Sequence, residues 1–262
     1  MELFTNTNVS DDLEINFNTF DFDDKNLFII KYLSIFSIIN ITSITFLSLT
    51  LQNLTLYKCI DYNKQLYISK NIIKSIFLAY IFYMRFLKIV SYIYYDNYDM
   101  KEIRYYGCIY VSCDLIGLLF IPKLPRTTQI HHSITVLLLF VIGNYNANEN
   151  DVVKYICIYT LWSFMSFIVN FYLGLRYFHI KEDNDYKLNK FDKLDNKIID
   201  KIRVIAFYNY ALCCFFNWII HFNLLLIRIF TFNLDFTTII YYILIIPIIR
   251  DDLILMSWLK NK

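Results

Sequence analysis

The stretch Thr127-Thr-Gln-Ile-His-His-Ser-Ile-Thr-Val-Leu-Leu-Leu-Phe-Val-Ile142 combines a long apolar run with two adjacent histidines near its start. Ionisable side chains inside a bilayer cost about 2.5–3.5 kcal/mol on insertion scales, so they usually face a bundle interior or a cavity. We therefore expect His131 and His132 to mark a site, together with Asp114 in the preceding apolar segment.

Apolar segments make up most of the chain. Of its 262 residues, 57% are hydrophobic and 19% aromatic, with only 4 glycines and 3 prolines. A helix needs about 20 apolar residues to cross roughly 30 Å of hydrocarbon. Seven segments meet this length: residues 27–51, 72–95, 103–122, 127–144, 153–178, 202–230 and 236–259. The sequence predicts an all-α, polytopic membrane helix bundle with about seven transmembrane helices and no separate soluble domain.

The remaining residues set the expected orientation. Residues 1–26 form an acidic extramembrane segment that lacks the basic flank and early apolar core of a signal peptide, and residues 260–262 form a short tail. Lysine and arginine gather in alternate loops, which the positive-inside rule places in the cytosol. We expect a lumenal or outside N-terminus, with a glycosylation sequon at Asn8, and a cytosolic C-terminus. The cytosolic charges are Lys58, Lys64, Lys70, Lys123, Arg126, six lysines within 181–201, Lys260 and Lys262.

Polar groups from five of these segments are expected at one depth. A helical rise of ~1.5 Å per residue puts them about 8–13 Å from the cytosolic helix ends. His131 and Thr135 share a helix face, whereas His132 is rotated by about 100° toward another neighbour. The candidate ligand-binding residues are His131, His132, Asp114, Thr135, Asn170, Asn209, Arg250 and Asp251.

Several polar residues have a simpler structural interpretation. Ser163, Ser166, Asn209 and Asn217 are expected to hydrogen-bond between helices, at about 0.6 kcal/mol each. We interpret His221 as a packed histidine and Arg250–Asp251 as an internal ion pair. The six cysteines lack metal-binding spacing, and no basic cluster suits nucleic acid. We predict no metal, no cofactor and no nucleic-acid partner.

The pattern of Asp114, Arg126 and His131-His132-Ser-Ile-Thr135 resembles the TLC family of membrane proteins, named after TRAM, LAG1 and CLN8. The resemblance covers residues 71–259 as a six-helix core, with the helix at 27–51 outside it. It implies a protein that binds, senses or modulates membrane lipids. It also implies a location in the endoplasmic reticulum or a host-cell endomembrane.

The family's ceramide synthases suggest an alternative. Their histidine pair is followed in the next span by acidic residues, but this chain has no Asp or Glu between Val152 and Lys181. A lipid N-acyltransferase using acyl-CoA would have His131, His132 and Asp114 as catalytic residues, with Asp114 or Asp251 replacing the missing acids. A transporter is a third alternative, disfavoured because few glycines and no broken helices are expected. The resemblance implies a membrane lipid or acyl chain as the partner, or acyl-CoA if the protein is an enzyme.

Overall fold

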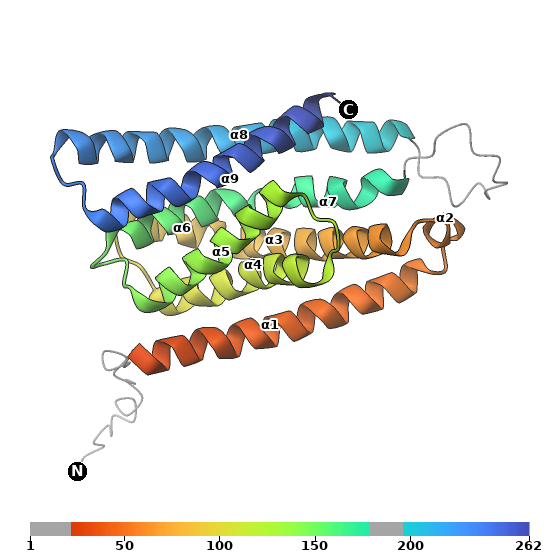
Figure 1. Cartoon of the computed structure of the whole chain (residues 1–262), viewed down its shortest axis with the longest axis horizontal. Helices are drawn as coiled ribbons and strands as arrows, with labels where there is room; N and C mark the ends of the chain where they lie inside the picture. The colour runs from red at the N-terminus through yellow and green to blue at the C-terminus, as the bar shows by residue number, and fades with distance from the viewer. Residues whose placement is uncertain (1–21, 179–195, 262) are drawn as a thin grey trace, which may run out of the picture.

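The computed structural model describes residues 22–178 and 196–261, and this part of the chain is entirely helical, without strands. Figure 1 shows the long helices running back and forth along the longest axis of the molecule. The elements are α1 (Phe22–Leu51), α2 (Thr55–Lys58), α3 (Tyr62–Tyr95), α4 (Met100–Phe120), α5 (Arg126–Asn144), α6 (Asp151–Phe164), α7 (Phe167–Leu175), the 3-10 turn η2 (Arg176–Phe178), α8 (Asn196–Phe230) and α9 (Phe236–Asn261).

Each of the seven predicted segments corresponds to a long helix or, for 153–178, to the α6–α7 pair. By length and composition, α1, α3, α4 and α8 can each cross a membrane, and the bent α6–α7 pair makes a fifth span if counted as one. The helices α5 and α9 are not in this set. Polar residues such as His131 and His132 interrupt the apolar sequence of α5, and Arg250, Asp251 and Asp252 interrupt that of α9. The chain is thus a helical protein with four or five candidate spans.

The first helix is part of the packed bundle. In Figure 1, α1 lies along one side of the molecule, with α8 and α9 on the opposite side. Asn40 of α1 is 1% exposed, and its Nδ2 donates a hydrogen bond to Oγ of Ser112 on α4 at 2.7 Å. Ile29 and Leu33 join a buried apolar cluster with residues of α3 and α4. Although we expected this helix to lie outside the six-helix core, it contributes directly to the interior of the bundle.

Helices α3 and α8 begin six or more residues earlier than their apolar segments do. Asp61 caps α3 by accepting a hydrogen bond from the backbone N–H of Asn63 at 3.0 Å, so the helix includes ten residues before the predicted start at 72. Asn196 similarly precedes the predicted start of α8 at 202. Most of the acidic segment 1–26, the sequon at Asn8, the lysines between 181 and 193, and Lys262 lie outside the described residues.

The predicted continuous span 153–178 is broken. Between α6 and α7 the axis bends by 45° across Met165 and Ser166. The regular hydrogen-bonding pattern of the α-helix is interrupted here. Ser166 Oγ donates a short-range bond to the carbonyl oxygen of Ser163 at 2.7 Å. The expectation of unbroken helices was therefore wrong. The absence of broken helices can no longer be used as an argument against a transporter.

Helices α3 and α7 approach closely next to this break. A β-carbon added at Gly174 would lie 2.7 Å from Cγ1 of Ile72 and 3.2 Å from the carbonyl oxygen of Ile68. A larger residue here would require the Ile72 side chain and the α3 backbone to shift. The close packing brings the polar start of α3 beside the second half of the broken span.

Candidate functional site

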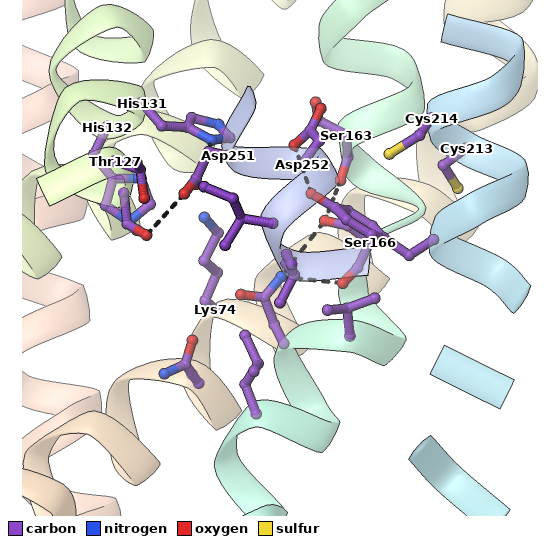
Figure 2. Close-up of a pocket in the computed structure, with 18 of the residues that line it drawn as sticks. Lys74, Thr127, His131, His132, Ser163, Ser166, Cys213, Cys214, Asp251 and Asp252 are labelled. Carbon is purple, nitrogen blue, oxygen red and sulfur yellow. Dashed lines mark hydrogen bonds and ion pairs between the residues drawn. The ribbon is translucent and has the colours of Figure 1, made fainter. Parts of the chain in front are cut away.

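A cavity of about 390 Å³ lies between α3, α5, α6, α7, α8 and α9. Its walls include apolar side chains such as Leu124, Val169, Leu173 and Leu255. Its polar lining comes from segments far apart in the sequence. Figure 2 shows Lys74, His131, His132, Asp251, Asp252, Ser163 and Ser166 around this space. Among the predicted residues, His131, His132, Asn170 and Asp251 line the cavity.

His131 is held at both ring nitrogens. Its Nδ1 lies 3.0 Å from Oδ2 of Asp251, and its Nε2 lies 3.0 Å from the hydroxyl of Tyr159. Thr128 donates a further hydrogen bond to Oδ1 of Asp251 at 3.1 Å. With an ionised Asp251 and a neutral ring, the proton sits on Nδ1 and Tyr159 donates to Nε2. The carboxylate therefore orients the imidazole, with its other nitrogen toward a hydroxyl group.

His132 belongs to a second, fully buried cluster. Its Nδ1 lies 3.2 Å from Oδ1 of Asp114, within ion-pair distance but without hydrogen-bond alignment. Asp114 is 0% exposed, forms an ion pair with Lys74 and accepts a hydrogen bond from Thr135 Oγ1 at 3.2 Å. Thr135 thus supports the Asp114 cluster rather than the His131 face on which we placed it. Asp114 lies behind the cavity wall, where it balances the charge of Lys74.

The two histidines serve different carboxylates. Their rings are 5.6 Å apart between centroids and are tilted by 60°. This arrangement agrees with the expected rotation of about 100° between adjacent helical residues. Each imidazole of the pair therefore has its own acid, Asp251 for His131 and Asp114 for His132.

Besides Asp114 and Thr135, two further predicted residues do not line the cavity. Arg250 is exposed and makes no ion pair with a described residue, so the predicted Arg250–Asp251 pair is wrong. Asn209 is half-buried and is not part of the lining. Residues adjacent to them in the sequence line the cavity instead. Tyr210, next to Asn209, donates a hydrogen bond to Oδ1 of Asp252 at 2.6 Å. A rotation of about 100° per residue decides which member of each run faces inward.

His221 is packed as predicted, but the hydroxyl groups of Ser163 and Ser166 donate to nearby carbonyl oxygens of the same α6–α7 segment rather than to another helix as expected. The side-chain oxygens of Asn209 and Asn217 have no hydrogen-bond partner in the described part of the chain. Asn170 Nδ2 donates to the carbonyl oxygen of Ser166 at 3.0 Å. His221 is 4% exposed, and its Nδ1 lies 2.8 Å from the carbonyl oxygen of Asn217. Its Nε2 lies 2.8 Å from the Tyr241 hydroxyl, so both nitrogens have partners within the packed interior.

Sequence reasoning missed the basic side of the cavity. Lys70, which we assigned to a cytosolic loop, is 5% exposed within α3, and Lys74 lies one turn further along. Arg176 of η2 also lines the cavity. A signal was present in the sequence, because buried polar residues cluster near the start of α3: Gln65, Ser69, Lys70, Asn71, Lys74 and Ser75.

The fold and cavity define a helical membrane protein with a polar chamber between its helices. Comparisons with protein-family models, curated proteins and solved structures found no match to the chain. The resemblance to the TLC family therefore depends on Asp114, the histidine pair and the helix pattern, and stays a prediction.

Proposed function

We propose that this protein spans the membrane seven times and binds, senses or modulates membrane lipids through the cavity. The observation that carries this proposal is a chamber that joins two carboxylate-paired imidazoles to an apolar wall. Ligand pockets in proteins typically measure about 300–1,000 Å³. At about 390 Å³, this cavity has room for a head group and the first part of one chain. The same proposal includes a TLC-like core over residues 71–259, a cavity near the cytosolic side of the membrane and an endomembrane location.

The apolar and polar linings divide the recognition of a lipid. Leu173 and Leu255 offer dispersion contacts to the methylene groups of a lipid chain. His131 and Asp251 offer hydrogen bonds to the polar end of the ligand.

Photocrosslinking tests this binding. A palmitoyl probe carrying a diazirine is added to membranes that contain the protein, and the labelled residues are mapped by mass spectrometry. We expect label on cavity residues and its loss in Leu255→Trp, which fills the chamber. Leu253→Trp is the matched control, because Leu253 is 51% exposed on the outside of the same helix. Label restricted to outward residues, and unchanged by Leu255→Trp, would contradict the proposal.

A second candidate function is N-acyl transfer to a lipid amine, which the Asp251–His131–Tyr159 arrangement favours. In this reaction, Nε2 of His131 accepts a proton from the substrate amine as its nitrogen attacks the thioester carbonyl of acyl-CoA. The carbon–sulfur bond then breaks, and the imidazolium returns the proton to the leaving thiolate. The products are an amide and free CoA, and Asp251 holds the ring in the required orientation throughout.

Incubation of the purified protein with a sphingoid base and labelled acyl-CoA separates the two functions. Acyl transfer predicts an N-acylated product that disappears in His131→Ala and His132→Ala and falls sharply in Asp251→Asn. His221→Gln is the control, because both ring nitrogens of this histidine bond to neighbouring helices and backbone within the packed interior, and it lies outside the cavity lining. Lipid photolabelling without any product would support binding alone.

A further inference from the structure

Not every basic side chain of the cavity forms an ion pair within the described part of the protein. Lys74 pairs with Asp114, but Lys70, one turn earlier on α3, has no ion pair or hydrogen bond with any described residue. Its side chain is 95% buried, given an exposure of 5%, and it lines the cavity. A buried ammonium group without a partner is costly unless a ligand supplies the opposite charge.

Local packing holds Lys70 in this position. A β-carbon at Gly117 on α4 would lie 3.1 Å from Cε and 3.2 Å from Nζ of Lys70. The missing side chain thus leaves room for the end of the lysine side chain against α4. The ammonium group is buried there, unlike that of a lysine that extends to bulk water.

A second cation lies nearby at the end of the broken span. The guanidinium carbon of Arg176 sits 5.1 Å from the ring centroid of Tyr67, which is one turn before Lys70 on α3. It also lies 4.6 Å from the ring of Trp258. Nε of Arg176 is buried without a hydrogen-bond partner in the described part of the chain, and no described carboxylate pairs with this arginine. Aromatic rings orient the guanidinium without neutralising it.

We propose that Lys70 and Arg176 form a binding site for the phosphate group of an amphiphilic ligand. This inference rests on the proposed lipid-binding function and names the ligand class. Phosphate suits the pair because it carries enough negative charge and enough oxygen acceptors for both an ammonium and a guanidinium group. The apolar residues Leu173 and Leu255 then take the attached chain.

The charges across the chamber give this ligand a direction. Asp251 and Asp252 come from α9, whereas Lys70 comes from α3 and Arg176 from the turn after α7. A phosphate near α9 would meet two carboxylates, and near α3 it meets two cations. The head group therefore binds on the α3–α7 side, which leaves His131 free to contact another polar group of the ligand.

The test uses the full chain in phosphatidylcholine nanodiscs, with binding followed by tryptophan fluorescence and calorimetry. Three probes separate the sources of affinity: monododecyl phosphate, inorganic phosphate and dodecanol. We expect monododecyl phosphate to bind at least about tenfold more tightly than dodecanol, the scale of one charge-assisted hydrogen bond. This advantage should disappear in Lys70→Met and fall several-fold in Arg176→Gln.

Lys64→Met is the matched control, because Lys64 is exposed on the same helix. Lys70→Met removes an unpaired buried charge, so we expect it to fold, and circular dichroism checks this. Equal, Lys70-independent binding of monododecyl phosphate and dodecanol would overturn the phosphate site but preserve the lipid-binding proposal. Lys70-dependent binding of inorganic phosphate, with no gain from the chain, would support the anion site and identify a free phosphate as its source. Failure of all three probes to bind would overturn both proposals.

Discussion

The buried ion pair between Lys74 and Asp114 gives a quantitative test of how this bundle is held together. The side chain of Asp114 is 0% exposed and that of Lys74 is 7% exposed, so neither charge reaches bulk water after its partner is removed. Breaking a buried pair in this way costs about 3–5 kcal/mol. We therefore expect Asp114→Asn to lower the free energy of unfolding by that amount.

The two single substitutions should differ in size. After Lys74→Met, the Asp114 carboxylate still has Thr135 and His132 at 3.2 Å. After Asp114→Asn, Lys74 has no other described carboxylate within ion-pair distance and has only the ring of Tyr110, at 5.1 Å, as a favourable charge contact. Lys74→Met should therefore destabilise less than Asp114→Asn.

The double variant supplies the decisive comparison. Replacing both members of a buried pair is often neutral, so Lys74→Met with Asp114→Asn should unfold within about 1 kcal/mol of the original protein. The coupling free energy between the two sites then reaches about 2 kcal/mol or more. Unfolding is followed by far-UV circular dichroism in mixed micelles with an increasing fraction of dodecyl sulfate.

An exposed ion pair provides the control. Lys154 lies 2.7 Å from Asp96, whose side chain is 63% exposed and whose backbone is left-handed, with φ of 51°. Asp96→Asn keeps a residue that tolerates this conformation and should cost less than about 1 kcal/mol. Additive single effects for Lys74 and Asp114, with a coupling within about 0.5 kcal/mol of zero, would refute the buried-pair interpretation.

Three further predictions concern local features. Gly174→Ala should cost about 1–3 kcal/mol of unfolding free energy in the same assay, because the added methyl group meets the α3 backbone. Asn40→Leu should loosen α1 and speed alkylation of Cys113, whose Sγ lies 3.5 Å from Asn40 Oδ1, as measured by peptide mass spectrometry. Asp235 precedes α9 and accepts a hydrogen bond from the backbone N–H of Thr238 at 2.8 Å, and bonds from this residue lower the pKa of Asp235. Its contribution is present above the ordinary carboxyl pKa and is lost as pH falls through the lower folded value. Asp235→Ala should therefore cost about 1 kcal/mol at neutral pH and little in strong acid.

Each local prediction has an opposing result. Unchanged stability of Gly174→Ala would show that α3 moves away at no cost. An unchanged alkylation rate in Asn40→Leu would show that apolar contacts alone hold α1. An equal cost of Asp235→Ala at neutral and strongly acidic pH would exclude its carboxylate charge as the cause.

The sequence predicted helix positions well because apolar length is a direct physical requirement of membrane spans. It also placed His132 beside Asp114, since the short connection between their helices leaves few alternatives, but it did not identify Asp251 as the partner of His131. It failed at Lys70, because a lysine next to an apolar segment has the same sequence signature whether it lies in a loop or in the first turns of a buried helix. Only the neighbouring buried polar residues of α3 distinguish the two cases.

Rotation about helix axes was the other limit. Arg250 and Asp251 are adjacent, yet one is exposed and the other contacts His131. Knowing which face of α9 turns inward requires the packing of α5 and α8 against it. The break after Phe164 was missed for a different reason, because it uses serine hydroxyl groups rather than glycine or proline.

In the proposed ligand-binding function, the hydroxyl of Tyr159 occupies the position at Nε2 of His131 that a polar group of the ligand would take. Because it already satisfies Nε2 at 3.0 Å, an arriving ligand must exchange one hydrogen bond for another, and the net gain at this nitrogen is small. Affinity must then come from the chain and the charged end of the ligand, while the imidazole discriminates between polar groups by their geometry. Release of a bound molecule would let the Tyr159 hydroxyl return to Nε2 of His131, so this nitrogen keeps a partner throughout.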